Sequence, residues 1–248
     1  MDRGLISADQ MDVPGEEFCR QLTATGLAQY DRMNNHPFVR SMAEGRATLE
    51  QMRIFGTGMY QVVHDAQRWT AAAYAGCEDQ ATRAIMLQSM LEEETGVYSK
   101  TVSHSEQLAD FCEALAQPRA VTYERAKRLG KHFKQWADFS EFLGRCRPYW
   151  LFRGVISMAG EAQFTEVCHT MIEALPKHYG IKGKGMVFWE VHGPIDVEHT
   201  GNAVRIVAPY LTTPERRQAL QDYFFQHIDF RYRAWLEPMG EIKYSVGS

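Results

Sequence analysis

Residues 48–66 of the chain read TLEQMRIFGTGMYQVVHDA. Thr48 and Gln51 open this stretch at the spacing of a capping box, in which each side chain accepts a hydrogen bond from the other residue's backbone N–H. The apolar residues that follow recur every three or four positions and fall on one helical stripe: Met52, Phe55, Met59, Val62, Val63 and Ala66. No proline stands between Pro37 and Pro118, so long helices can run through this region. The stretch predicts a long amphipathic helix.

The same periodicity predicts further helices. One is expected from about residue 79 to 104, and another region of helix over 138–178, in which Pro148 should begin or kink a helix. Thr213 followed by proline has the pattern of a last helix start. Because no segment alternates apolar and polar residues, we predict an all-α protein. Its expected architecture is a single-domain up-and-down bundle of seven to nine helices over residues 15–248, after a flexible tail of residues 1–14.

Composition excludes several classes of protein. The chain has 248 residues, a formal net charge of −4 and 45% hydrophobic residues, which is typical of a folded globular domain. Neither nucleic acid nor a membrane is expected as a partner, since there is no basic patch and no apolar run of roughly 18 residues. The five cysteines are odd in number and form no C-x-x-C pair, which argues against disulfides or a thiolate zinc site. A cytoplasmic location is therefore expected.

A triplet of polar residues near the C-terminal third suggests a metal site. His192, Asp196 and His199 stand at positions i, i+4 and i+7, which places them within about 60° of one another on a helix. Imidazole nitrogens together with a carboxylate suit iron, manganese or zinc. The alternative is an ordinary solvated helix face, and the triplet alone does not decide between the two.

Two other positions favour the metal interpretation. His104 follows Glu93 by eleven residues, almost three whole turns, so on one helix they would share a face. Glu161 stands among apolar and small residues, and a buried carboxylate is costly unless it is paired or binds metal. A salt bridge to Arg153 is the alternative for Glu161. With the triplet, three histidines and three carboxylates from three helices could meet in the core.

The order E-E-x-G, a histidine, a lone glutamate and then H-x3-D-x2-H resembles the haem-oxygenase-like di-iron oxidases and oxygenases. That superfamily also contains pyrroloquinoline-quinone synthase and thiaminase II. The stretch His36-Pro37-Phe38, followed by Gly45, Thr48 and Gln51, extends the resemblance, which covers roughly residues 30–235. The resemblance implies the haem-oxygenase-like fold. It also implies a six-residue ligand set, which is Glu93, His104, Glu161, His192, Asp196 and His199.

The sequence departs from the family pattern in two places. The first glutamate and histidine of the family usually stand about seven residues apart, so this chain is expected to hold an extra helical turn there, and Glu92 or Glu94 remains an alternative to Glu93. Pro194 interrupts the final triplet, so His192 is expected on a bend. Because the last ligand helix is often mobile in this family, one of two Fe(2+) ions is expected to be loosely held.

The resemblance implies an iron-dependent oxidoreductase with O2 as co-substrate. The expected reactions are N-oxygenation, oxidative C–C cleavage or decarboxylation, or desaturation of a small amino-acid-derived or carboxylate substrate in specialised-metabolite biosynthesis. An external electron donor and a homodimer are further expectations. A substrate carboxylate needs a cation, for which Arg153 and Arg205 are candidates. The candidates for the pocket wall are Tyr60, His64, Tyr149 and Trp189.

Three alternative functions stay open. A metal-free quinone-forming oxidase of the same fold shares the Asp196–His199 stretch. A thiaminase-like hydrolase would need a cysteine nucleophile, for which Cys146 is the candidate because Arg145 and Arg147 flank it. The third alternative is a non-catalytic helical interaction protein.

Overall fold

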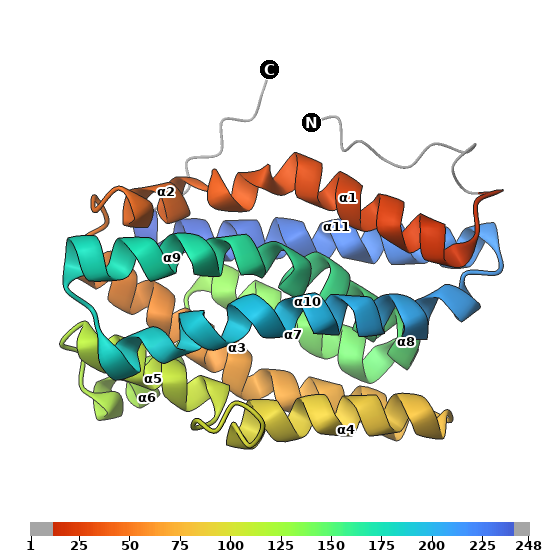
Figure 1. Ribbon diagram of the computed structural model, residues 1–248, viewed down its shortest axis with the longest axis horizontal. Helices are drawn as coiled ribbons and strands as arrows, with labels where there is room; N and C mark the ends of the chain where they lie inside the picture. The colour runs from red at the N-terminus through yellow and green to blue at the C-terminus, as the bar shows by residue number, and fades with distance from the viewer. Residues whose placement is uncertain (1–11, 241–248) are drawn as a thin grey trace.

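The computed structural model describes residues 12–240, with side chains throughout that range except at 29–32, 34 and 193–200. These residues form eleven α-helices and no strand, arranged as one elongated bundle (Figure 1). The all-α bundle predicted from the sequence is confirmed. The helix count exceeds the predicted seven to nine because three helices, α2, α6 and α8, have eight residues or fewer.

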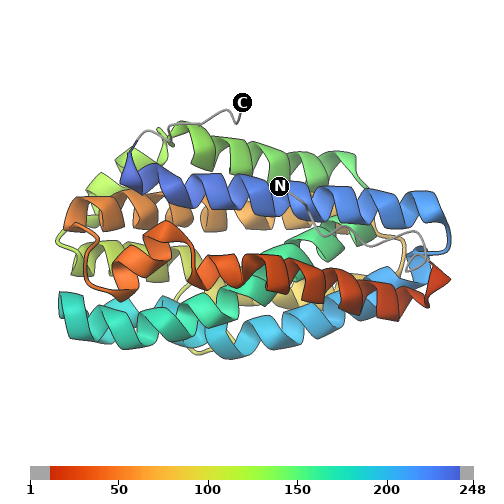
Figure 2. The ribbon, with the colours of Figure 1, turned by 90° about the horizontal axis from the view of Figure 1, so that it is seen from above.

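The α-helices follow one another with short connections. Their bounds are α1 Gly15–Asn34, α2 Pro37–Ala43, α3 Leu49–Ala75, α4 Gln80–Thr95, α5 His104–Ala114, α6 Arg119–Ala126, α7 Lys131–Cys146, α8 Tyr149–Gly154, α9 Phe164–Tyr179, α10 Val187–Val207 and α11 Pro214–Leu236. Seen from above, the long helices run along a common axis (Figure 2). None of the helices in the described range combines the length and the apolar character needed to cross a membrane.

Helix α3 forms as its sequence predicts. Thr48 Oγ1 accepts from the backbone N–H of Gln51 at 3.2 Å, and Gln51 Oε1 accepts from the N–H of Thr48 at 2.8 Å, which completes the capping box. The predicted apolar stripe turns inward, and Met52 and Phe55 are fully buried. Because α3 packs on α5 and α7, it supplies the central wall of the bundle.

The prediction of a single helix from about residue 79 to residue 104 is wrong. Helix α4 ends at Thr95, and Gly96 follows with φ of 62°, a left-handed conformation that terminates helices. The chain turns over residues 97–103, and α5 begins at His104 with Ser103 as its N-cap. The expected extra helical turn between Glu93 and His104 is therefore a reversal between two helices.

The region predicted as helix over 138–178 is interrupted. Pro148 caps the start of α8 as expected, but a π-helix at Val155–Gly160 and a 3₁₀ turn at Glu161–Gln163 separate α8 from α9. Arg231 on α11 donates to the carbonyl oxygen of Gly160 and, at 2.6 Å, to Oε1 of Gln163. This side chain thus holds the irregular segment that carries Glu161.

Helix α10 contains His192 and Pro194 without a break, so His192 lies within helix rather than in an interruption of it. The helix is continuous from Val187 to Val207, through Pro194, so the missing N–H of the proline is accommodated within it. Trp189 on the same helix is fully buried. Its ring packs against the rings of Phe111 and Phe164, with centroids 5.4 and 5.9 Å away. Aromatic packing therefore fixes α10 in the core.

Candidate metal centre

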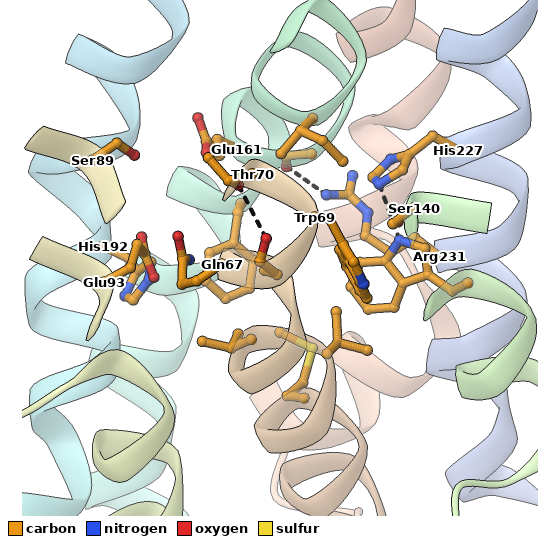
Figure 3. Close-up of a pocket in the computed structure, with 18 of the residues that line it drawn as sticks. Gln67, Trp69, Thr70, Ser89, Glu93, Ser140, Glu161, His192, His227 and Arg231 are labelled. Atoms are coloured by element: carbon orange, nitrogen blue, oxygen red, sulfur yellow. Dashed lines mark hydrogen bonds between the residues drawn. The ribbon is translucent and has the colours of Figure 1, made fainter. Parts of the chain in front are cut away.

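Three polar side chains from three helices meet inside the bundle. Glu93 on α4, His104 at the start of α5 and His192 on α10 each offer one ligand atom, and these atoms lie within 4.8 Å of one another. His104 is fully buried and the ring centroids of the two histidines are 4.4 Å apart. Figure 3 shows Glu93 and His192 together at one side of a cavity.

A backbone hydrogen bond orients His192. Its Nδ1 lies 2.7 Å from the carbonyl oxygen of Phe188, one turn earlier in α10. A carbonyl oxygen can only accept, so Nδ1 carries the hydrogen and the lone pair of a neutral ring is at Nε2. The ring of Phe188 also packs on His192 with centroids 4.1 Å apart. Such a partner on the other ring nitrogen is what fixes the orientation of a metal-ligating histidine.

His104 lies between two glutamates. Nε2 is 3.4 Å from Oε1 of Glu92, and Nδ1 is 2.8 Å from Oε2 of Glu93. Burial by itself lowers the pKa of His104, but the charge of Glu93 and the contacts of the ring with both carboxylates outweigh it, so the pKa is raised. The imidazole site therefore favours a positive charge, either a proton or a metal cation.

The geometry distinguishes the three consecutive glutamates. Glu92 is buried and accepts hydrogen bonds from the backbone N–H groups of Tyr98 and Ser99, at 2.7 and 3.2 Å from Oε2. Burial alone would raise the pKa of Glu92, but these bonds and the Ser99 side chain lower it. Glu94 is exposed. Of the alternatives open from the sequence, Glu93 is the glutamate that lies in the cluster.

The residues of the cluster fit a metal ion. With Nε2 of His104 donating to Glu92, the lone pair of a neutral ring is at Nδ1 and faces a carboxylate oxygen of Glu93, which is also an acceptor. Nδ1 is buried and makes no well-formed hydrogen bond among the described residues. Nδ1 and this carboxylate oxygen, 2.8 Å apart, need a positive charge between them, which either a proton on Nδ1 or a metal cation supplies. One carboxylate with two imidazoles is a donor set suited to iron.

Of the other three predicted ligands, the structure describes the side chain of Glu161 alone. Glu161 lines the same cavity as Glu93 and His192 but lies outside the three-residue cluster. The side chains of Asp196 and His199 lie outside the described residues. Their positions on α10 are one and two turns beyond His192, so the sixfold ligand set stays a prediction for these three residues.

A cavity of about 150 Å³ adjoins the cluster. Its wall is apolar for the most part, with Met59, Val62, Val63, Ala66, Trp69, Phe152, Ile156, Phe164, Phe188 and Trp235 among the lining side chains. Helices α3, α4, α7, α10 and α11 all contribute to it. A concave, mostly apolar space with a few polar groups is what small-molecule sites provide.

Of the residues predicted to bind substrate, the structure places Arg153 in this cavity wall. Arg205 is exposed and donates to Asn202. The side chain of His64 is half exposed and lies beside Asp65. The ring of Tyr60 stacks on the ring of His64. Trp189 is fully buried in the hydrophobic core. The cavity lining does not include these four residues or Tyr149. The prediction of Arg205 rests on its charge and its nearness in sequence to His199, and that of the other four on their residue types, neither of which separates a cavity wall from a packed core or an exposed face.

Sequence reasoning missed several polar residues of the cavity, among them Thr70, Ser140, His227 and Arg231. Ser140 on α7 and His227 on α11 are buried and line it. The only signal in the sequence was that each interrupts an otherwise apolar inward stripe. Cys146, the candidate nucleophile of a thiaminase-like enzyme, is exposed and is not part of the cavity lining.

A family model described as "Iron-containing redox enzyme" matches residues 53–232, well over half of the chain. The chain belongs to this family. The matched range contains Glu93, His104 and His192. Within this family of iron-containing redox enzymes, the cluster of two histidines and a carboxylate is the described group that suits the metal.

Individual relatives of this family member are distant. A 4-aminobenzoate synthase of Chlamydia pneumoniae is 22% identical over 175 residues, which cover 67% of this chain and 71% of the relative. A TenA homologue from Pseudomonas syringae superposes with a TM-score of 0.77 at 13% identity, over 92% of this chain and 94% of that chain. A CADD-like protein of unknown function from Nostoc punctiforme gives 0.70 at 19% identity, over 90% and 96%.

A domain of unknown function from Shewanella denitrificans, described as having a haem-oxygenase-like fold, superposes with a TM-score of 0.74 at 14% identity, over 89% of this chain and 91% of that chain. At these identities, the structural likeness establishes the fold alone. The haem-oxygenase-like fold expected from the sequence resemblance is thereby confirmed.

Proposed function

We propose that this protein is a non-haem di-iron enzyme that uses O2 to oxidise a small carboxylate or amino-acid-derived substrate. The observation that carries the proposal is the buried cluster of Glu93, His104 and His192 at the edge of an apolar cavity. The family membership supports iron as the metal. In the proposal Glu161, Asp196 and His199 complete the ligand set, and an external donor supplies electrons.

When bound, iron would supply the one-electron redox chemistry that O2 requires. The protein's own residues do the rest. The backbone carbonyl oxygen of Phe188 fixes the ring of His192, and the side-chain carboxylate of Glu92 fixes the ring of His104. The mostly apolar walls suit the hydrocarbon part of a substrate, and Arg153 lines the cavity where it could hold a substrate carboxylate. The compound named in the Chlamydia pneumoniae relative, 4-aminobenzoate, is itself a small carboxylate.

Anaerobic titration of the chelator-treated chain with Fe(II), with bound iron measured after desalting, tests the proposal. We expect two irons per wild-type chain, and O2 consumption once iron is bound. His104→Ala and His192→Ala should each lower the affinity by at least about 100-fold, since loss of an outer-shell partner alone costs about 10- to 100-fold. The control is His169→Ala, because His169 is exposed. Unchanged iron binding in both ligand variants, or no iron in wild type, contradicts the proposal.

A further inference from the structure

The cavity has a second polar region, away from the metal cluster. Ser140 on α7 and His227 on α11 lie on the side opposite Glu93 and His192 (Figure 3). Arg153 on α8 also lines the cavity, and α8 packs against both α7 and α11. All three side chains are buried, with exposed fractions of 1% for Ser140 and 2% for Arg153 and His227.

Each of these three residues has an unused hydrogen-bonding atom. Ser140 Oγ, Arg153 Nε and His227 Nδ1 are buried and have no hydrogen-bond partner among the residues that the structure describes. A buried polar atom without a partner costs stability. Three such atoms around one cavity therefore point to a ligand that satisfies them.

His227 acts here as a donor. The indole Nε1–H of Trp136 donates to Nε2 of His227 at 3.0 Å. Since indole nitrogen only donates, Nε2 must be the acceptor and Nδ1 carries the hydrogen of the neutral ring. Burial and, to a smaller extent, the charge of Arg231 lower the pKa of His227 to about 3 against the opposing charge of Glu161, so the ring stays neutral at physiological pH.

All three groups can therefore donate. The Arg153 guanidinium adds a positive charge, and the Ser140 hydroxyl can turn its hydrogen toward the same ligand. Three donors, one of them cationic, match an oxyanion. The same cavity lining holds a second cation, Arg231, which also donates to Gly160 and Gln163, and a carboxylate, Glu161. The lining between this region and the metal cluster is mostly apolar and aromatic, with Gln67, Thr70 and Glu161 among it (Figure 3), which suits a largely hydrocarbon body attached to the oxyanion.

The cavity volume indicates the size of the part of the ligand that the protein would surround. About 150 Å³ is the volume of an engineered protein cavity that takes up one benzene ring. We propose that Arg153, Ser140 and His227 form the carboxylate-binding subsite for a substrate with a single ring or a short branched aliphatic chain. Its carboxylate binds at this subsite and its other end faces Glu93 and His192. This inference rests on the proposed function, whose substrate class it names.

Binding to the full-length, chelator-treated chain tests the subsite without iron. Trp69, Trp136 and Trp235 line the cavity, so tryptophan fluorescence reports ligand entry. Benzoate should bind saturably. Benzamide, its neutral analogue of the same shape, should bind with an affinity at least 10-fold lower. Arg153→Met should weaken benzoate at least 10-fold while changing benzamide less than 3-fold. Arg145→Met is the control, because Arg145 is exposed and pairs with Glu141.

Thermal unfolding separates a ligand-binding arginine from a structural one. Removing a buried cation with an unused donor should raise the Tm of Arg153→Met by about 2 °C or more, although the ligand affinity falls. Ser140→Ala keeps the proposal testable if Arg153→Met does not fold, and it should weaken benzoate by about 3- to 10-fold. Equal affinities for benzoate and benzamide, or wild-type benzoate affinity in both variants, would overturn the inference.

Iron titration and benzoate binding are measured separately, so the two proposals can fail separately. Benzoate binding that depends on Arg153 in a chain that takes up no iron would retain the subsite and reject the di-iron function. Two irons per chain with no saturable benzoate binding would reject the subsite and retain the metal centre.

Discussion

Glu93 and His104 face each other across a chain reversal. Oε2 of Glu93 lies 2.8 Å from Nδ1 of His104, although α4 ends two residues after Glu93 and α5 begins at His104 itself. The reversal depends on Gly96, whose φ of 62° ends α4. The metal cluster is therefore assembled by a loop conformation rather than by the face of one helix.

Gly96→Ala should disrupt this reversal. A Cβ at this position would lie 2.5 Å from the carbonyl oxygen of Val102, and a left-handed conformation costs a non-glycine residue about 1–2 kcal/mol. We expect the free energy of unfolding in urea to fall by about 2 kcal/mol or more, and the iron affinity to fall with it.

Gly76→Ala is the matched control for Gly96→Ala. Gly76 ends α3 with φ of −89°, and the nearest atom to an added Cβ is 3.7 Å away. This variant should keep wild-type stability and iron binding. Equal effects of the two substitutions would show that the left-handed turn does not position His104.

Glu92→Gln should weaken iron binding without removing a proposed ligand. Glu92 Oε1 lies 3.4 Å from Nε2 of His104, and a carboxylate in this position orients a ligating imidazole and raises its basicity. Substitution of such partners costs about 10- to 100-fold in metal affinity. Fe(II) titration measures this loss.

Glu94→Gln is the control for Glu92→Gln, because Glu94 is exposed on the same helix. It should bind iron as the wild type does. If Glu92→Gln also binds iron with wild-type affinity, Glu92 serves the 97–103 turn alone, through its hydrogen bonds to Tyr98 and Ser99.

The sequence predicted the fold well because helical periodicity and caps are local. Thr48 with Gln51 marks the start of α3, and Thr213 caps α11 as predicted. The same periodicity carries a predicted helix straight through Gly96, because the positive φ that ends α4 is not visible in an apolar pattern. Glu93 and His104 do meet, but for a different reason than the predicted shared face.

The part of the site that the sequence could not predict depends on contacts between distant residues. His227 has its tautomer fixed by Trp136, 91 positions earlier, and nothing local to either residue signals that pairing. The irregular segment before α9 likewise depends on Arg231, whose partners Gly160 and Gln163 lie about 70 positions away. Such relationships appear only when the helices are packed.

Arg231→Met should loosen the segment that carries Glu161. The guanidinium donates to the carbonyl oxygen of Gly160 and to Oε1 of Gln163, and methionine leaves both acceptors without that donor. Each lost bond to a charged group costs about 1.5–3 kcal/mol, so urea unfolding should show a loss of about 3 kcal/mol or more. Arg233→Met, at an exposed position on the same helix, should change stability by less than about 0.5 kcal/mol. A small loss in both variants would contradict the role of Arg231.

His36 makes the stability of the protein depend on pH. Its Nδ1 accepts from the backbone N–H of Phe38 at 3.1 Å, and its Nε2 donates to the carbonyl oxygen of Tyr232 at 3.0 Å, so the folded protein holds the neutral ring. Burial, opposed by the bond to Tyr232 and aided by the charge of Arg231, lowers the pKa of His36 to about 4. The ordinary pKa of an unfolded histidine is about 6.5.

The unfolded chain therefore binds a proton at His36 from about pH 6.5 downward, whereas the folded chain does so only near pH 4. The stabilisation is complete above pH 6.5 and is lost as the pH falls toward 4, by about 1.4 kcal/mol per pH unit. Between pH 7 and pH 5, His36 should thus account for a loss of about 2 kcal/mol in the free energy of unfolding.

Urea unfolding in the presence of chelator at both pH values measures this loss, and His36→Gln should remove that share of the pH dependence. The control, His169→Gln, replaces an exposed histidine and should keep the wild-type slope. The raised pKa of His104 changes stability with pH in the opposite direction, so the variants are compared with the wild type rather than with a fixed value. If the unfolding free energy of His36→Gln has the same pH slope as the wild type, the folded protein tolerates a protonated His36.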